Sequence, residues 1–274
     1  MSYPDKPFPC AGERPVHYTA HRVSSSLNIN GHLDKPVWKR ATRTARFVDL
    51  IQGARPIYDT RAAVLWDDMY LYIGFWVEEP FVEATLIARD SLVWTNNDVE
   101  VFIAAANAYY EFEVNALNTV YEAFFIWADA YEQAGFSQLP EFARDAPGVK
   151  PWNGVGYTAH PRGKRLGFFQ WDMPGLQSAV QVDGTLNDNS DRDRGWTVEL
   201  AFPWAGLKSL LLGDDRSSPP RDGDVWRISF SRFNTYKEAS PAQDSGGWAL
   251  SAHGIWDSHI PECFPYIHFS SSEV

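Results

Sequence analysis

Two runs of alternating residues decide the fold of this chain: Asp98-Val99-Glu100-Val101-Phe102-Ile103-Ala104 and Tyr109-Tyr110-Glu111-Phe112-Glu113-Val114-Asn115. Successive side chains of a β-strand point to opposite faces of its sheet. The first run therefore places Glu100 and Phe102 on one face, and the second places Glu111, Glu113 and Asn115 on one face. Only residues 105–108 separate the two runs, so we predict a β-hairpin.

Further short strands are expected on both sides of this hairpin. They are rich in β-branched and aromatic residues and end at turn residues such as Asn, Gly, Asp and Pro. The expected strands are 27–31, 60–65, 70–77, 177–184, 196–202, 225–232 and 265–270. Short strands with frequent turn signals are typical of an all-β sandwich. We therefore predict an all-β, antiparallel β-sandwich or jelly roll with few short helices.

The organisation along the chain is expected to be simple. No internal repeat, low-complexity segment or linker divides the sequence, so we predict a single domain over residues 27–274 and an N-terminal arm over residues 1–26. Residues 118–180 are expected to form a long inserted segment on one sheet face, in which residues 124–132 could be a helix or a strand. Long loops in compact domains are commonly functional. The aromatic side chains of this segment could roof a pocket: Phe124, Phe125, Trp127, Phe168, Phe169 and Trp171.

Charge and hydropathy limit the partners. The 24 Lys and Arg residues against 35 Asp and Glu residues give a net charge of −11, and no basic cluster stands out. Nucleic acid and acidic membrane surfaces need a basic footprint, so neither is expected as a partner. No apolar run approaches the ~20 residues that cross a bilayer, so a soluble protein is expected. No signal peptide is visible, which favours a cytoplasmic location, or a secreted one if a signal was removed.

The two cysteines, Cys10 and Cys263, lie near the two ends of the chain. They could pair if the end strands are neighbours. In a reducing compartment, where disulfides are rare, two free thiols are expected instead.

Aromatic residues make up 15% of the chain and include 12 Trp. A Trp ring offers an apolar face and an N–H donor, which match the C–H faces and hydroxyl edges of sugars. Most of these rings are expected in the sheet core. The surplus, together with many Asp, Asn and Glu residues, favours carbohydrate as a ligand.

Five motifs follow one another in a particular order along the chain. They are residues 29–38 (INGHLDKPVW), 64–73 (VLWDDMYLYI), 97–103 (NDVEVFI), 195–204 (GWTVELAFPW) and 259–264 (HIPECF). This series resembles carbohydrate-binding module family 9, a group related to DOMON-type domains, over roughly residues 27–270. The resemblance implies a jelly-roll β-sandwich that binds glucan or xylan chains at the reducing-end sugar, which two Trp rings clamp.

Individual residues match that family unevenly. Trp94, followed six residues later by Glu100, resembles the family's clamp Trp and ligand-binding Glu. The family's Arg on the next strand falls at Glu113, so the contacts with sugar hydroxyls must differ. The second clamp Trp is displaced to Trp256, and His259 lies nearer the expected place. The predicted site is a Trp-flanked, carboxylate-lined groove for a sugar or oligosaccharide end: Trp94, Glu100, Glu111, Glu113, Asn115, Trp256 and His259.

The same carboxylates permit other interpretations. They could be the solvated face of an antiparallel sheet, or they could ligate calcium, which prefers oxygen. Calcium is the one candidate cofactor, and Asp67-Asp68 and the turn 188–193 are further oxygen-rich candidates. Haem would need axial Met or His ligands, and Met69 lies in a turn motif. The sequence does not determine the oligomeric state.

An enzyme is the main alternative to a binding module. Clustered carboxylates also hydrolyse glycosidic bonds, so the groove could belong to a glycosidase or lyase, or to an isomerase or cyclase with an aromatic pocket. Acid–base chemistry would then fall to Glu100, Glu113 or His259. No nucleophile motif such as Gly-x-Ser-x-Gly is present, so catalytic residues stay unassigned and a binding module is favoured.

Overall fold

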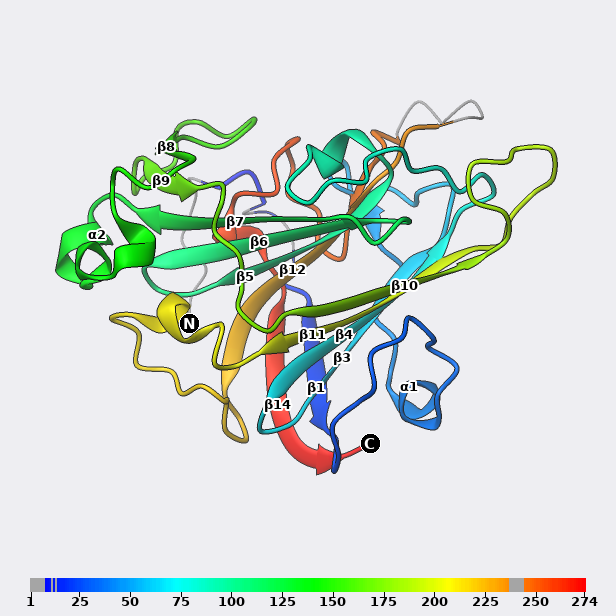
Figure 1. Ribbon diagram of the computed structural model, residues 1–274, viewed down its shortest axis with the longest axis horizontal. Helices are drawn as coiled ribbons and strands as arrows, with labels where there is room; N and C mark the ends of the chain where they lie inside the picture. The colour runs from blue at the N-terminus through cyan, green and yellow to red at the C-terminus, as the bar shows by residue number, and fades with distance from the viewer. Residues whose placement is uncertain (1–7, 11, 13, 237–243) are drawn as a thin grey trace.

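The structure is a computed structural model that describes residues 8–10, 12, 14–236 and 244–274, and this part of the chain is dominated by β-strands (Figure 1). The strands are β1 (His17–Arg22), β2 (Val48–Asp49), β3 (Thr60–Trp66), β4 (Tyr70–Glu78), β5 (Asp98–Ala104), β6 (Ala108–Asn115), β7 (Val120–Trp127), β8 (Val149–Trp152), β9 (Arg165–Phe168), β10 (Gln177–Asp183), β11 (Gly195–Pro203), β12 (Val225–Phe233), β13 (Gly247–Ala249) and β14 (Tyr266–Glu273). The helices are α1 (Pro36–Arg40), α2 (Ala130–Gln133) and the 3-10 helices η1 (Val93–Thr95), η2 (Phe136–Gln138), η3 (Pro140–Phe142), η4 (Lys208–Leu211) and η5 (Pro261–Cys263). None of the helices among these residues is both long and apolar enough to cross a bilayer. The prediction of an all-β fold is confirmed.

The strands follow one hydrogen-bonded path, in the order β10-β11-β4-β3-β1-β14-β12-β5-β6-β7-β9-β8. This path curves so that its two halves pack face to face. The rings of Phe112 on β6 and Phe202 on β11 are 5.3 Å apart, and those of Phe75 on β4 and Phe230 on β12 are 6.1 Å apart. The core therefore lies between two layers, as expected for a sandwich.

The segment His17–Arg22 corrects two expectations. It was assigned to an N-terminal arm, but it forms β1, which inserts between β14 and β3. It runs parallel to both neighbours, so the sheet is mixed rather than wholly antiparallel. Only Tyr18 and Ala20 of this strand are buried, and two buried side chains among His and Arg residues give little periodic signal.

The predicted hairpin is formed by β5 and β6, and it has two different faces. Glu100 pairs with Glu113 and Phe102 pairs with Glu111 across the strands. The alternate residues, such as Val101 and Phe112, belong to the core between the layers. Because the apolar residues of the other parity fill the core, the carboxylates of this hairpin lie on the outer face of the layer.

The inserted segment contributes both strands and core. Residues 120–127 form β7 and α2 begins at Ala130, so the stretch that could have been a helix or a strand begins as a strand and ends in a short helix. Its aromatic residues divide between the two faces. Phe124 and Phe168 join the core, whereas Phe125 and Phe169 lie with Tyr109 on the outer face.

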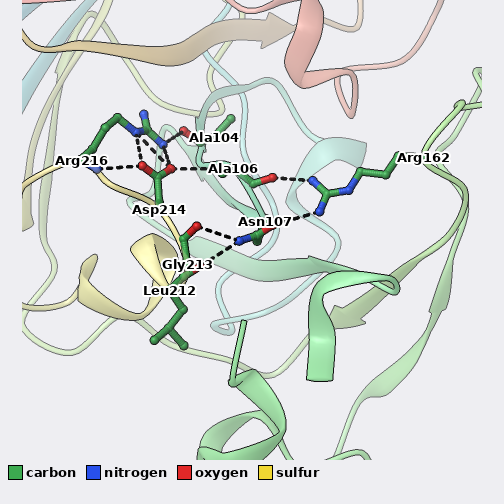
Figure 2. Close-up of polar contacts among 8 residues, drawn as sticks. All are labelled: Ala104, Ala106, Asn107, Arg162, Leu212, Gly213, Asp214 and Arg216. Atoms are coloured by element: carbon green, nitrogen blue, oxygen red, sulfur yellow. Dashed lines mark hydrogen bonds and ion pairs between the residues drawn. The ribbon is translucent and has the colours of Figure 1, made fainter. Parts of the chain in front are cut away.

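The turn of the β5–β6 hairpin is clamped by two arginine-containing groups (Figure 2). Arg162, in the connection between β8 and β9, donates to the carbonyl of Ala106 and to Oδ1 of Asn107. Asp214 accepts from the backbone N–H of Ala106 at 2.9 Å and pairs with Arg216 at 2.7 Å. These contacts fix the β8–β9 connection relative to the strands that carry the carboxylates.

Two further contacts join segments that are distant in the sequence. Cys10 and Cys263 form a disulfide with a Cα–Cα distance of 5.8 Å, so the expectation of two free thiols is wrong. Neighbouring end strands, β1 and β14, bring the two cysteines together. On the other side of the molecule, buried Glu199 of β11 accepts from Nε1 of Trp38 at 2.8 Å and from Nζ of Lys35 at 2.6 Å. The motifs at 29–38 and 195–204 thus meet in one structural contact.

Candidate ligand-binding site

A cavity of about 430 Å³ opens on the outer face of β5, β6 and β7. Its floor comes from these strands, and its walls come from η1, the β8–β9 region and the loop before η5. It is lined by Asp90, Leu92, Trp94, Glu100, Phe102, Glu111, Glu113, Tyr121, Lys150, Trp152, Val155, Phe169, Phe233, Trp256, Asp257, Ser258 and His259. The volume lies within the ~300–1,000 Å³ usual for small-molecule sites.

Two partly exposed tryptophans flank this cavity. Trp94 in η1 is 43% exposed and packs edge-on against Tyr121, with ring centroids 5.0 Å apart. Trp256 in the last loop is 39% exposed and packs in the same way against Phe233, also at 5.0 Å. In a T-shaped contact the neighbour covers at most one face of the Trp ring, and about 40% of each Trp stays exposed. The structure therefore brings the two predicted clamp residues to one cavity from distant parts of the chain.

Four carboxylates lie along the floor. Asp98, Glu100, Glu111 and Glu113 are buried and share one face of β5 and β6. One oxygen each of Asp98, Glu100 and Glu113 lie within 4.8 Å of one another. Ser231 on β12 donates to Oε2 of Glu100 at 2.6 Å. No described basic side chain forms an ion pair with Asp98, Glu100 or Glu113.

Burial and mutual repulsion favour the protonated forms of these acids. Burial raises the pKa of Glu100 to about 7. Burial also raises the pKa values of Asp98, Glu111 and Glu113 well above their ordinary range, and the charge of Glu100 adds to each of these shifts. The floor can therefore offer both proton donors and strong acceptors to hydroxyl groups.

His259 is held neutral beside these acids. Burial lowers the pKa of His259 to about 4. Arg165 donates to the hydroxyl of Tyr109 at 2.9 Å, and that hydroxyl lies 3.2 Å from Nδ1 of His259. With Tyr109 donating to Nδ1, the ring proton lies on Nε2, which faces Oε1 of Glu111 at 3.5 Å. His259 thus presents a neutral N–H donor to the carboxylate side of the cavity.

Asp257 ties the loop after β8 to the loop before η5. Its Oδ2 accepts from the backbone N–H groups of Val155, Gly156 and Tyr157 at 2.8–2.9 Å. Its Oδ1 accepts from the backbone N–H of His259 at 2.8 Å. Gly154, with φ +88°, precedes this contact, and a Cβ there would lie 2.8 Å from Oδ2 of Asp257. One carboxylate therefore sets the position of the wall that carries Val155 relative to His259.

The structure separates the predicted site residues into two sets. Trp94, Glu100, Glu111, Glu113, Trp256 and His259 line the cavity. Asn115 does not, although it shares the face of Glu113. Its side-chain oxygen accepts from the backbone N–H groups of Leu117 and Thr119, both at 3.0 Å, and its amide donates to Leu86. Asn115 therefore closes the β6–β7 turn.

The lining also contains residues outside the predicted site set, and of these Phe169 was expected as part of an aromatic roof, whereas Trp152 was not expected. Trp152 and Phe169 of the inserted segment face Phe125 and His259 on the outer sheet face. Lys150 places its ammonium 4.3 Å from the Phe169 ring. Phe102 also lines the cavity and has the parity of Glu100, so alternation alone was a sufficient signal for it. No comparable signal marked Trp152, because β8 is short and contains Pro151.

The other oxygen-rich turns serve local structure. Asp67 accepts from the backbone N–H groups of Met69 and Tyr70 and from the hydroxyls of Ser26 and Tyr72. In the turn 188–193, Asp193 accepts from the backbone of Val82 at 2.8 Å and of Thr185 at 2.6 Å. Met69 is 60% exposed at the β3–β4 turn, which is no pocket for a haem ligand.

This fold is similar to that of solved carbohydrate-binding modules of family 9. Two solved structures of that family share it, both of a module from Caldicellulosiruptor kristjanssonii. The glucose complex is 14% identical, with a TM-score of 0.53 over 93% of this chain and 96% of that one. The cellotriose complex is 13% identical, with a TM-score of 0.50 over 93% and 94% of the two chains.

A third solved structure is similar over a comparable length. It is a Bacteroides uniformis protein assigned provisionally as carbohydrate-binding, with 13% identity and a TM-score of 0.59 over 93% of this chain and all of that one. The amino-acid sequence itself matches no protein-family profile and no curated protein. The likeness therefore lies in the fold.

Proposed function

We propose that the protein binds a sugar or the end of an oligosaccharide in the cavity between Trp94 and Trp256. The observation that carries this proposal is the position of two half-exposed Trp rings beside buried carboxylates in one cavity of about 430 Å³. Trp faces suit the C–H faces of a pyranose ring, and carboxylates accept charge-assisted hydrogen bonds from its hydroxyls. Similar folds hold glucose and cellotriose, which supports saccharides as the ligand class.

The charged residues that line the cavity narrow the class of saccharide proposed as the ligand. Among the described lining residues, Asp90, Glu100, Glu111, Glu113 and Asp257 are acidic, and Lys150 alone is a lysine or arginine. At a pH at which these acids are ionised, a uronic acid or sulfated sugar would meet repulsion there. The proposed ligand is therefore neutral and rich in hydroxyl donors.

An enzyme with the same groove is the second candidate, because a pKa of about 7 at Glu100 would suit a general acid. The geometry argues for binding instead. A glycosidase places its two carboxyl groups on either side of the scissile bond. Glu100 and Glu113 are direct cross-strand neighbours, so both lie on the same side of any ligand.

The disulfide bears on the compartment. Cys10 and Cys263 are bonded, and such bonds persist mainly in oxidising environments. This favours an extracellular or periplasmic setting over a reducing cytoplasm. Polymeric saccharides are available as ligands in those settings.

Calorimetry with glucose, cello-oligosaccharides and xylo-oligosaccharides tests the proposal, with mass spectrometry of the same mixtures to detect cleavage. At pH 8, we expect binding without turnover. Glu100→Gln should weaken saccharide binding by about 1.5–3 kcal/mol, which is the value of a hydrogen bond to a charged group. Glu132→Gln, on the exposed side of α2, is the matched control and should bind like wild type.

Two results would contradict the proposal. The first is absence of binding to all these saccharides by folded protein. The second is product formed by wild type and lost in Glu100→Gln with the ligand still bound, because that outcome requires a catalytic carboxylate.

A further inference from the structure

The floor of the cavity holds polar groups that lack partners. Oδ2 of Asp98 and Oε2 of Glu113 are buried and accept no hydrogen bond from the described residues. The hydroxyl of Ser229, on β12, is also buried without a partner. Ser229 has the same parity as Ser231, which donates to Glu100, so it faces the same side of the sheet. Buried polar groups are nearly always hydrogen-bonded, so the two carboxylate oxygens on this face need a proton, a water or an ion as a partner.

The spacing of the carboxylates fits a single ion. One oxygen each from Asp98, Glu100 and Glu113 lie within 4.8 Å of one another. Calcium binds its oxygen ligands at about 2.3–2.6 Å, so two oxygens on the same ion are at most about 5 Å apart. The three groups therefore need no rearrangement of the strands to share one cation.

We propose that Asp98, Glu100 and Glu113 bind a calcium ion at the floor of the cavity. The donor set consists of carboxylate oxygens from two adjacent strands, with a serine hydroxyl nearby, and such hard ligands select calcium rather than zinc or copper. A divalent ion offsets two of the three negative charges.

No protein cation takes this role among the described residues. Arg232 lies on the opposite face of β12, where it pairs with Glu79 at 3.3 Å. His259 faces Glu111, and Lys150 stacks on Phe169. A buried charge without a partner is costly, so an external cation is the remaining way to hold all three carboxylates ionised.

The ion would be reachable from the cavity. Glu100 and Glu113 line it, whereas Asp98, two residues from Glu100 along the same face of β5, is not part of the lining. Calcium takes six to eight ligands, so three protein oxygens leave positions for water or for hydroxyls of a bound molecule. Asp98 is therefore the residue that separates cation binding from direct contact with a ligand.

The test is a calcium titration of chelator-treated protein by calorimetry, with no saccharide present. Terbium luminescence excited through Trp gives a second readout, because Trp94 and Tyr121 lie beside the floor. We expect one site with a dissociation constant of about 10⁻⁶–10⁻³ M. Asp98→Asn and Glu113→Gln should each weaken it at least tenfold. Asp188→Asn, in a surface turn, is the matched control and should leave it unchanged.

Near-UV circular dichroism establishes that each variant is folded. If Asp98→Asn does not fold, the calcium titration of Glu113→Gln tests the site instead. Wild type that binds no calcium at millimolar concentration overturns the proposal. So does calcium affinity that survives both substitutions. Because the titration contains no saccharide, a protein that fails to bind sugar can still pass it, and the two proposals fail separately.

Discussion

Glu100 and Glu113 face one another directly across β5 and β6, both almost completely buried and neither paired with a described basic side chain. Like charges placed directly opposite each other destabilise a sheet. This pair therefore imposes a cost on the folded protein that depends on whether the acids carry protons. The same pair gives the cavity its acceptors, so the cost is located at the candidate site.

The stability of the protein should consequently fall as the pH rises. Burial raises the pKa of Glu100 from 4.5 to about 7. The folded state therefore binds a proton more tightly than the unfolded chain, and the resulting stabilisation is complete below pH 4.5 and lost as the pH rises to 7. For Glu100 alone this amounts to about 3 kcal/mol. Urea denaturation with a chelator present, between pH 4.5 and 8, measures it.

An amide does not titrate. In Glu100→Gln, the free energy of unfolding should therefore fall by about 3 kcal/mol less between pH 4.5 and 8 than it does in wild type. Glu132→Gln, whose side chain is largely exposed, should keep the wild-type slope. Equal slopes in wild type and Glu100→Gln would contradict the shifted pKa.

The two flanking tryptophans should contribute to affinity rather than to stability. We expect Trp94→Ala and Trp256→Ala each to weaken saccharide binding at least tenfold, which is about 1.4 kcal/mol. Because both rings are about 40% exposed, the free energy of unfolding should change by no more than about 1 kcal/mol. Calorimetry and denaturation measure the two effects.

Trp248→Ala supplies the contrasting control. Trp248 is fully buried and its Nε1 donates to Asp244 at 2.6 Å. Its removal should cost about 3–5 kcal/mol of stability. If Trp94→Ala behaved like Trp248→Ala and left affinity intact, Trp94 would be a core residue.

Glu199 does not line the cavity, but we expect it to be essential to the stability of the fold. It is fully buried and accepts from Trp38, from Lys35 and from the backbone N–H of Asn30 at 2.9 Å. Glu199→Gln turns an amide N–H toward these donors and should cost about 3–5 kcal/mol, as for other broken buried pairs.

A double-mutant cycle of Glu199→Gln and Lys35→Met measures how much of this loss of stability comes from the ion pair between the two residues. The side chain of Lys35 is 21% exposed, so its removal alone should cost less than Glu199→Gln. A Glu199→Gln variant within about 1 kcal/mol of wild type would mean that the contact between the two motifs does not stabilise the fold.

The alternation of residues 98–115 predicted the hairpin, its register and the face that carries the carboxylates, because the period of a strand fixes all three. The same argument placed Asn115 on the correct face but not in the lining, since at the end of a strand a side chain can bond the turn. It also could not find β1, whose parallel pairing depends on strands more than 40 and 240 residues away. Phe169 was among the aromatic residues expected to roof a pocket, and it lines the cavity. Trp152 reaches the cavity through tertiary packing of a long segment, which no local pattern encodes.

The last prediction concerns Asp257, which holds one wall of the cavity. Its two oxygens accept four backbone N–H groups, three of them from residues 155–157. Asp257→Asn replaces one acceptor oxygen with a donor, so either the loop 155–157 or His259 loses its partner. We expect faster hydrogen exchange over residues 153–158 and a several-fold weaker saccharide affinity, because Val155 and His259 line the cavity.

The loss of stability in Asp257→Asn should stay within about 1–3 kcal/mol, the cost of leaving one buried group unsatisfied. Asp188→Asn, in the turn 188–193, removes an exposed carboxylate that accepts from the nearby Ser190, and it should change neither exchange nor affinity. Unchanged exchange in Asp257→Asn would show that other contacts hold this loop. Faster exchange with wild-type affinity would show instead that the ligand does not depend on the wall that Asp257 positions.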